Sequence, residues 1–275
     1  MVRAFRFVFL SDLHFGSVPD GLANALLEDI LAQAADLNIV AGDLTMRARA
    51  HEFEAARHWI GSLKGETLVL PGNHDLPYFN LVERFARPFG RYRSAMTGVA
   101  ALEGPVGTQR GAVICAVNTA RAWQPHPLWQ EGAVNMRDLA ASLSAFAAHT
   151  GGNGIAVRAA VTHHPLIRPA AMRRRMHRAI GARRAVAALL AAGVEIFMSG
   201  HVHRSFAEMF EMGGRRALAL GAPTALSSRL RGERNGYWVA TVGASSIALS
   251  LRQVGDSGFD EVAAPVFPRP LGANG

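Results

Sequence analysis

The sequence predicts an α/β protein with two packed β-sheets. Over residues 6–200, short apolar runs that end in turn residues alternate with segments of helical period. Such alternation is typical of βαβ units and of a largely parallel sheet. After residue 204 the helical segments stop, and further short strands follow one another through glycine-rich turns.

Six runs rich in β-branched and aromatic residues predict the strands of the first part. They are RFVFLSD at 6–12, LNIVAGD at 37–43, TLVLPGN at 67–73, AVICAVN at 112–118, IAVRAAVTH at 155–163 and VEIFMSG at 194–200. Between them, apolar residues recur every three to four positions. This period predicts helices at 21–35, 51–63, 134–149 and 170–193, the last one broken near Gly181.

The second part adds antiparallel strands. They are predicted at SFAEMFEM, RALALGAP, GYWVATV and SSIALSLRQV. Because the chain of 275 residues suffices for one substantial domain, we expect a single domain over residues 1–255. Residues 256–275 are rich in proline and glycine, and we expect a loosely attached tail there.

Composition excludes several classes of protein. A hydrophobic fraction of 49% predicts a packed core rather than disorder. No apolar run approaches the ~20 residues of a membrane helix, and the first run is too short for a signal peptide, so we expect a cytoplasmic protein. Cys115 is the only cysteine, which excludes a disulfide framework. The net charge of +8 accompanies an arginine and alanine bias typical of GC-rich genomes, but it also favours phosphate-bearing partners.

Polar residues follow five predicted strands at the point where each strand ends. The motifs are Asp12-Leu13-His14, Gly42-Asp43, Gly72-Asn73-His74-Asp75, His163-His164-Pro165 and Gly200-His201-Val202-His203. Asp12 and Asp43 are separated by one βαβ length, as are Asp43 and Asn73. The motifs therefore fall at the carboxyl edge of the sheet, where open α/β sheets bind ligands. An extended backbone would place both members of each D-x-H or H-x-H pair on one face.

The candidate side chains offer imidazole nitrogen and oxygen but no thiolate. Such donors suit Mn, Fe, Zn or similar divalent ions. The seven candidate ligands are too many for one tetrahedral zinc ion, and they match two ions that share a carboxylate. They are Asp12, His14, Asp43, Asn73, His163, His201 and His203.

These five motifs resemble the pattern of the calcineurin-like metallophosphoesterase family, which is D-x-H, G-D, G-N-H-[D/E], H and G-H-x-H in that order. The resemblance implies two mixed sheets flanked by helices, in agreement with the strand pattern, and two divalent metal ions. The first ion would be held by Asp12, His14, Asp43 and His203, and the second by Asp43, Asn73, His163 and His201. His163 is preferred to His164 because the family's ligand stands two residues before proline.

The resemblance also implies a mechanism. Two ions ~3.5–4 Å apart bind the phosphate oxygens and hold a bridging hydroxide in line with the leaving group. His74 would protonate the departing alkoxide or stabilise its charge, and Asp75 would orient the His74 ring. We therefore expect a metal-dependent phosphoric diester hydrolase.

Differences from the motifs of particular sub-families limit the substrate classes that we expect. GDLTMRA differs from the G-D-x-x-D-R-G of Ser/Thr protein phosphatases, and without that D-R-G continuation a diester is favoured over a dianionic monoester. HHP and GHVH look more like the branch of cyclic-nucleotide phosphodiesterases and bacterial phosphate-starvation phospholipases C. A DNA-acting nuclease is an alternative, because recombination nucleases share GNHD. A non-catalytic scaffold, such as the retromer subunit with this fold, is another, although no ligand motif is missing.

Three segments outside the motifs bear on partners. DLPYFNL at 75–81 and NTARAWQPHPLWQ at 118–130 offer either an apolar rim for a base or acyl chain, or ordinary core packing. The arginine-rich segment 173–184 is either a solvated helix face or a contact for anionic lipid or polynucleotide. It favours a phospholipid substrate and peripheral membrane contact over a free nucleotide. No obligate protein partner is evident.

Overall fold

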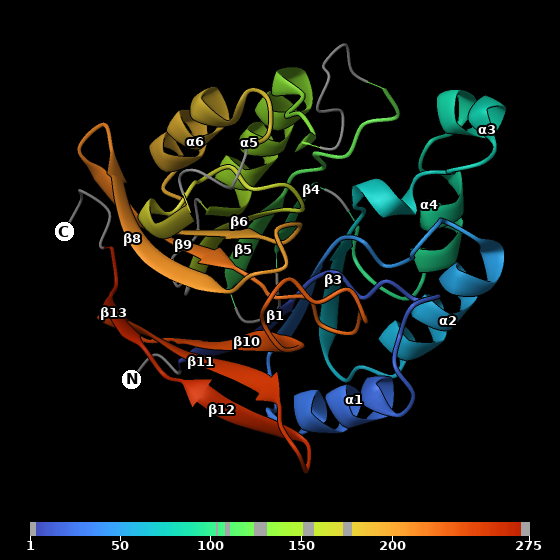
Figure 1. The fold of residues 1–275 in the computed structure, drawn as a ribbon. Helices are drawn as coiled ribbons and strands as arrows, with labels where there is room; N and C mark the ends of the chain where they lie inside the picture. The colour runs from blue at the N-terminus through green and yellow to red at the C-terminus, as the bar shows by residue number, and fades with distance from the viewer. Residues whose placement is uncertain are drawn as a thin grey trace.

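A computed structural model describes residues 4–102, 104–107, 111–123, 131–150, 157–172 and 178–270. Two mixed β-sheets pack face to face, and helices cover the outer face of each sheet (Figure 1). The predicted fold class is therefore confirmed. Among the described residues, no helix combines the length and apolar character needed to span a membrane.

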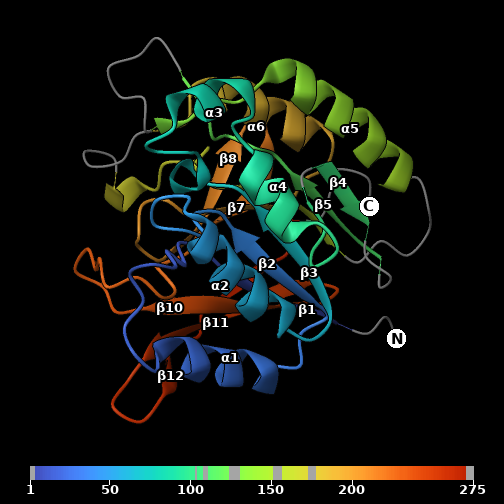
Figure 2. The same cartoon turned by 90° about the vertical axis from the view of Figure 1, so that its right-hand side faces the viewer.

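The first sheet has the strand order β12-β11-β10-β1-β2-β3, and β13 also pairs with β11. Its parallel strands are β1 (Phe5–Leu10), β2 (Leu37–Ala41) and β3 (Glu66–Leu70). Its antiparallel strands are β10 (Gly236–Val242), β11 (Ser246–Val254), β12 (Phe259–Ala263) and β13 (Val266–Pro268). Figure 2 shows α2 (Ala50–Gly61) in front of β1–β3 and α1 (Leu22–Ala32) below them, beside β12. Helix α4 (Gly90–Met96) packs in the same apolar layer.

The second sheet has the strand order β4-β5-β6-β7-β9-β8. Its parallel strands are β5 (Ala112–Ala116), β6 (Val157–Thr162), β7 (Ile196–Ser199) and β9 (Arg215–Gly221). The antiparallel edges are β4 (Gly104–Gly107) and β8 (Phe206–Met212). Helices α5 (Met136–Thr150) and α6 (Ala182–Ala191) cover its outer face.

Side chains of the central strands point alternately to the two faces of a sheet, and this alternation decides which residues form the core between the sheets. In β1, Phe7 and Phe9 point toward the second sheet, whereas Val8 and Leu10 point toward the helices. All four side chains are fully buried. A strand buried on both faces reads as a continuous apolar run, which is why the sequence marks these strands clearly.

Two expectations about elements need correction, and two short helices were not predicted. The region 256–270 is not a loose tail, because β12 and β13 pair with β11. Arg269 also forms a bidentate ion pair with Glu195, at 2.7 Å for both contacts. The predicted helix 170–193 is helical only at α6, with a single 3-10 turn at Ala170–Met172; residues 173–177 lie outside the described part. Helices α3 (Leu81–Ala86) and α4 were not predicted, because both are too short for a clear period.

Candidate metal centre

The five motifs meet where the carboxyl ends of β1, β2 and β3 face those of β6 and β7. The two sheets are joined directly at this edge. Nδ1 of His163, after β6, donates to the carbonyl of Ala41 at the end of β2 over 2.7 Å. The backbone N–H of His201, after β7, donates to Oδ2 of Asp12 over 3.0 Å. Asp12 and His201, which are 189 positions apart in the chain, thus share one site.

Three of the predicted ligands form a first group around Asp12. Oδ1 of Asp12 lies 3.6 Å from Nε2 of His14 and 3.2 Å from Nε2 of His203. All three side chains are buried. This group holds three of the four ligands expected for the first ion.

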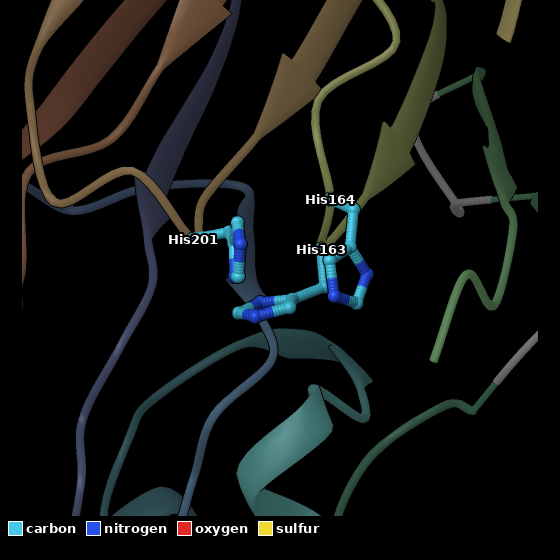
Figure 3. Close-up of side chains that lie close together, drawn as sticks. All are labelled: His163, His164 and His201. Atoms are coloured by element: carbon cyan, nitrogen blue, oxygen red, sulfur yellow. The ribbon is translucent and has the colours of Figure 1, made fainter. Parts of the chain in front are cut away.

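The remaining ligands form a second group that shares Asp43 with the first. Oδ2 of Asp43 lies 3.3 Å from Nε2 of His163 and 3.8 Å from Nε2 of His14. Oδ1 of Asn73 is 3.3 Å from the same His163 nitrogen. The rings of His163 and His201 are 5.2 Å apart, and Figure 3 shows them at the ends of neighbouring strands. Asp43 therefore stands between the two groups, as expected of a shared carboxylate.

The backbone at five of the seven candidate ligands is left-handed rather than extended. Positive φ angles occur at Asp12 (59°), His14 (49°), Asp43 (53°), His201 (70°) and His203 (56°). The expected face-sharing of residues i and i+2 in extended backbone is therefore wrong. Non-glycine residues adopt this conformation at a free-energy cost and often do so at functional sites. Here it turns each side chain back toward a common centre just after its strand ends.

Two motif glycines are required by close approach. A Cβ on Gly72 would lie 2.0 Å from Oδ1 of Asp43. A Cβ on Gly200 would lie 1.8 Å from Oγ of Ser11 and 2.9 Å from Oδ2 of Asp12. These glycines let the backbone after one strand pass against the ligand of another strand.

Hydrogen bonds to backbone carbonyls fix the ring orientation of the histidines. Nδ1 of His14 contacts the carbonyl of Thr45 at 3.4 Å, and Nδ1 of His203 contacts that of Arg229 at 3.2 Å. His163 makes the corresponding contact to Ala41. Because a carbonyl only accepts, Nδ1 carries the proton, and in the neutral ring Nε2 keeps its lone pair for a metal ion.

The charges of the cluster are strongly coupled. Burial favours the neutral carboxyl of Asp43, but His163, His74 and His14 outweigh it and hold its pKa well below the usual range. Burial opposes protonation of His163, yet the neighbouring Asp43 carboxylate raises its pKa to about 9. Burial and the positive charge of His163 lower the pKa of His201 to about 3. A bound metal ion would displace the proton of His163, so metal affinity would depend on pH.

The donor set fits divalent metal ions. Within the described residues, Oδ1 of Asp12 and Nε2 of His14 are buried without a hydrogen-bond partner. Leaving such atoms unsatisfied costs about 1–3 kcal/mol each, and a cation between them would satisfy both. Four groups of three His or Asp side chains have their ligand atoms within 4.8 Å of one another. Nitrogen and carboxylate oxygen suit borderline transition metals such as Mn, Fe and Zn.

His74 lies beside the first group, and its ring is held differently than expected. Its Nδ1 donates to the carbonyl of Met46 over 2.8 Å, and its ring packs edge-on against His14 at 4.8 Å. Its backbone N–H donates to Oδ1 of Asp43 over 2.8 Å. The His74 ring is half-buried, and it also forms a group of possible metal ligands with His14 and Asp43.

Asp75 does not orient the His74 ring, so that expectation is wrong. Its fully buried carboxylate accepts from the backbone N–H groups of Leu44, Thr45 and Gly72 and from Oγ1 of Thr45. It ties the loop after β2 to the loop after β3. Sequence reasoning placed Asp75 next to His74 along the chain but could not see that its side chain turns the other way.

His164 also lies in the cluster. Its ring centroid is 4.5 Å from that of His201, and its Nδ1 contacts Oγ1 of Thr119 at 2.9 Å (Figure 3). The choice of His163 over His164 stays a prediction, because His163, His164 and His201 together form one group of possible metal ligands. The sequence did not predict the backbone carbonyls that hold the histidine rings. They belong to Ala41, Thr45, Met46 and Arg229. They leave no sequence signal, because every residue has a backbone carbonyl.

The donor cluster suits metal ions, and comparison with known proteins identifies the family. The sequence profile described as calcineurin-like phosphoesterase matches residues 5–205. The chain therefore belongs to the calcineurin-like phosphoesterase family, which indicates a phosphoester hydrolase that uses divalent metal ions. No curated protein sequence matches the chain significantly.

Solved structures are similar to this chain at low sequence identity. A purple acid phosphatase from yellow lupin (Lupinus luteus) seeds is 14% identical with a TM-score of 0.66, and the match covers 98% of this chain and 54% of that chain. An uncharacterized protein from Streptococcus pneumoniae, described as a phosphoesterase by prediction, is 12% identical with a TM-score of 0.48 and coverages of 98% and 100%. Vacuolar Protein Sorting 29 from Cryptosporidium parvum is 14% identical with a TM-score of 0.43 and coverages of 97% and 100%.

Proposed function

We propose that this protein hydrolyses phosphodiesters with two divalent metal ions, manganese, iron or zinc. The observation that carries the proposal is the position of Asp43 between two groups of donor side chains. Asp12, His14 and His203 would hold one ion together with Asp43, and Asn73, His163 and His201 would hold the other. Such a pair of ions binds phosphate oxygens and lowers the pKa of a shared water molecule.

The chain's own residues would divide the remaining work. The carbonyls of Thr45, Ala41 and Arg229 keep the ligand imidazoles in the tautomer that binds metal. His74 would act as an imidazolium: Nδ1–H stays bonded to the Met46 carbonyl, and Nε2–H would pass its proton to the leaving alkoxide, which leaves a neutral ring. A partly exposed ring suits this role, because the substrate must reach it.

The preference for a diester needs support other than the missing D-R-G continuation. Arg47 stands at the arginine position of the G-D-x-x-D-R-G pattern, between Met46 and Ala48. The sequence therefore lacks the aspartate and the glycine of D-R-G but keeps its arginine. The supporting feature is apolar surface beside His74, where Tyr78 and Phe79 are 60% and 66% exposed. A diester carries a second organic substituent that could contact this surface, whereas a monoester does not.

Steady-state hydrolysis of bis-nitrophenyl phosphate and nitrophenyl phosphate with Mn²⁺ tests the proposal. We expect a higher kcat/KM for the diester and complete loss of activity with a chelator. A kcat/KM clearly higher for the monoester would contradict the diester preference. The variant Arg47→Ala gives a second test. If Arg47 binds a dianionic monoester, its replacement should raise the KM for the monoester far more than the KM for the diester. Absence of hydrolysis with either ester would favour the scaffold alternative.

A further inference from the structure

A cluster of large apolar side chains is exposed around α3. Tyr78, Phe79, Leu81, Val82, Phe85 and Trp123, here called the α3 patch, are 59–81% exposed. They are six of the eleven large hydrophobic side chains that stand out as exposed in the described part of the chain. Tyr78, Leu81, Phe85 and Trp123 also line one cavity of about 270 Å³. Contiguous apolar surface of this kind marks an interaction site.

The polarity of α3 is inverted. Arg84 points inward and is only 8% exposed, whereas Leu81, Val82 and Phe85 of the same helix face water. The guanidinium of Arg84 donates to the carbonyls of Ala122 (2.9 Å) and Pro77 (3.1 Å), which joins the segment of Trp123 to the segment of Tyr78. The fold thus buries a charged side chain and holds the apolar ones outside.

The α3 patch adjoins the candidate metal centre. The guanidinium of Arg49 lies 5.9 Å from the ring centroid of Phe79. Arg49 ends the loop whose Met46 carbonyl holds His74, and Tyr78 follows His74 by four residues. Figure 1 shows α3 at the periphery of the molecule, beyond α4.

The charges around the α3 patch are basic. Arg49 and Arg87 are exposed beside it, and Arg121 lines its cavity. The acidic residue of α3, Glu83, is neutralised by an ion pair with Arg91. Apolar side chains within a basic rim are complementary to an anionic lipid surface, which attracts arginine and takes up apolar groups.

We propose that the α3 patch docks this protein onto an anionic lipid surface, so that the diester hydrolysed at the candidate metal centre is a phospholipid headgroup. The substrate half of this inference rests on the proposed function. Arginine at the rim and aromatic rings at the patch correspond to the residues that membrane interfaces favour.

Co-sedimentation with phosphatidylcholine vesicles, with and without phosphatidylglycerol, tests the docking. We expect binding to the anionic vesicles that weakens with salt, and a blue shift of Trp123 fluorescence that Trp123→Phe removes. Val82→Asp should weaken vesicle partitioning by about 10–100-fold, since one apolar side chain no longer inserts. Val262→Asp is the matched control, because Val262 is 53% exposed on β12, far from α3 in Figure 1, and this variant should bind like the wild type.

The assay separates this inference from the proposed function. Val82→Asp should hydrolyse bis-nitrophenyl phosphate at the wild-type rate but lose turnover of phosphatidylglycerol vesicles. No vesicle binding by the wild type, or equal losses for Val82→Asp and Val262→Asp, would overturn the docking. A dimer in sedimentation that Val82→Asp dissolves, without vesicle binding, would overturn it in favour of contact between two copies. Vesicle binding without hydrolysis of bis-nitrophenyl phosphate would support the docking and contradict the proposed function.

Discussion

Replacing Asp75 by asparagine tests whether this residue holds the site together or acts through His74. One carboxylate oxygen accepts from the N–H groups of Gly72 (2.8 Å) and Leu44 (3.1 Å). The other accepts from the N–H (2.9 Å) and the hydroxyl (2.9 Å) of Thr45. Burial and the charge of Asp43 raise the pKa of Asp75 to about 6, so the carboxylate is ionised at mildly alkaline pH.

The magnitude follows from these four bonds. An asparagine amide keeps one oxygen but turns an NH₂ group toward at least one buried backbone N–H, which is left without an acceptor. An unsatisfied buried donor costs about 1–3 kcal/mol, and the bonds that remain lose their assistance from the negative charge. We expect Asp75→Asn to lower the free energy of unfolding by about 2–4 kcal/mol.

Urea unfolding without added metal measures this loss, because bound ions would stabilise the folded state separately. Hydrolysis of diesters with aryl and alkyl leaving groups then gives the functional comparison. Asp75→Asn should leave the ratio of the two kcat/KM values unchanged, since the Met46 carbonyl still holds His74. His74→Ala should instead lose ~10²–10⁴-fold on alkyl esters and much less on aryl esters. Wild-type stability of Asp75→Asn combined with an alkyl-selective loss would refute this account of Asp75.

Three further predictions concern the metal centre and the carboxyl-terminal strands. Asp43→Asn should lower the content of both metal ions and His203→Ala mainly of one, and two ions retained by an active Asp43→Asn would contradict the ligand assignment. Gly200→Ala should lose metal in elemental analysis, because its Cβ would stand 1.8 Å from Oγ of Ser11 and displace Asp12; full occupancy would refute this. Arg269→Ala should lower the free energy of unfolding by about 1–3 kcal/mol, since Glu195 loses a bidentate partner, and no change in urea unfolding would rule out a stabilising tie.

The family and the candidate ligands were accessible from the sequence because both leave local signals. The apolar runs that became β1, β2 and β3 are buried on both faces, and the residues after them carry donors at βαβ spacing. The spacing alone placed Asp12, Asp43 and Asn73 at one sheet edge, and strand pairing confirms that β1, β2 and β3 are parallel neighbours. A repeated pattern of strand, turn and donor is a property of short segments, so composition and order suffice to find it.

The tertiary structure decided what depends on contacts between distant segments. The left-handed backbone at Asp12 and His201 exists because the loops after β1 and β7 must pass against each other, with His201 bonding to Asp12. The partners of Asp75 are fixed by the loop after β2, about 30 residues earlier in the chain. The short β12 and β13 are held by β11, and the inverted α3 is held by carbonyls at Pro77 and Ala122. Periodicity reports which face of a segment is apolar, but only packing decides which partner that face meets, and whether it meets protein or is left exposed.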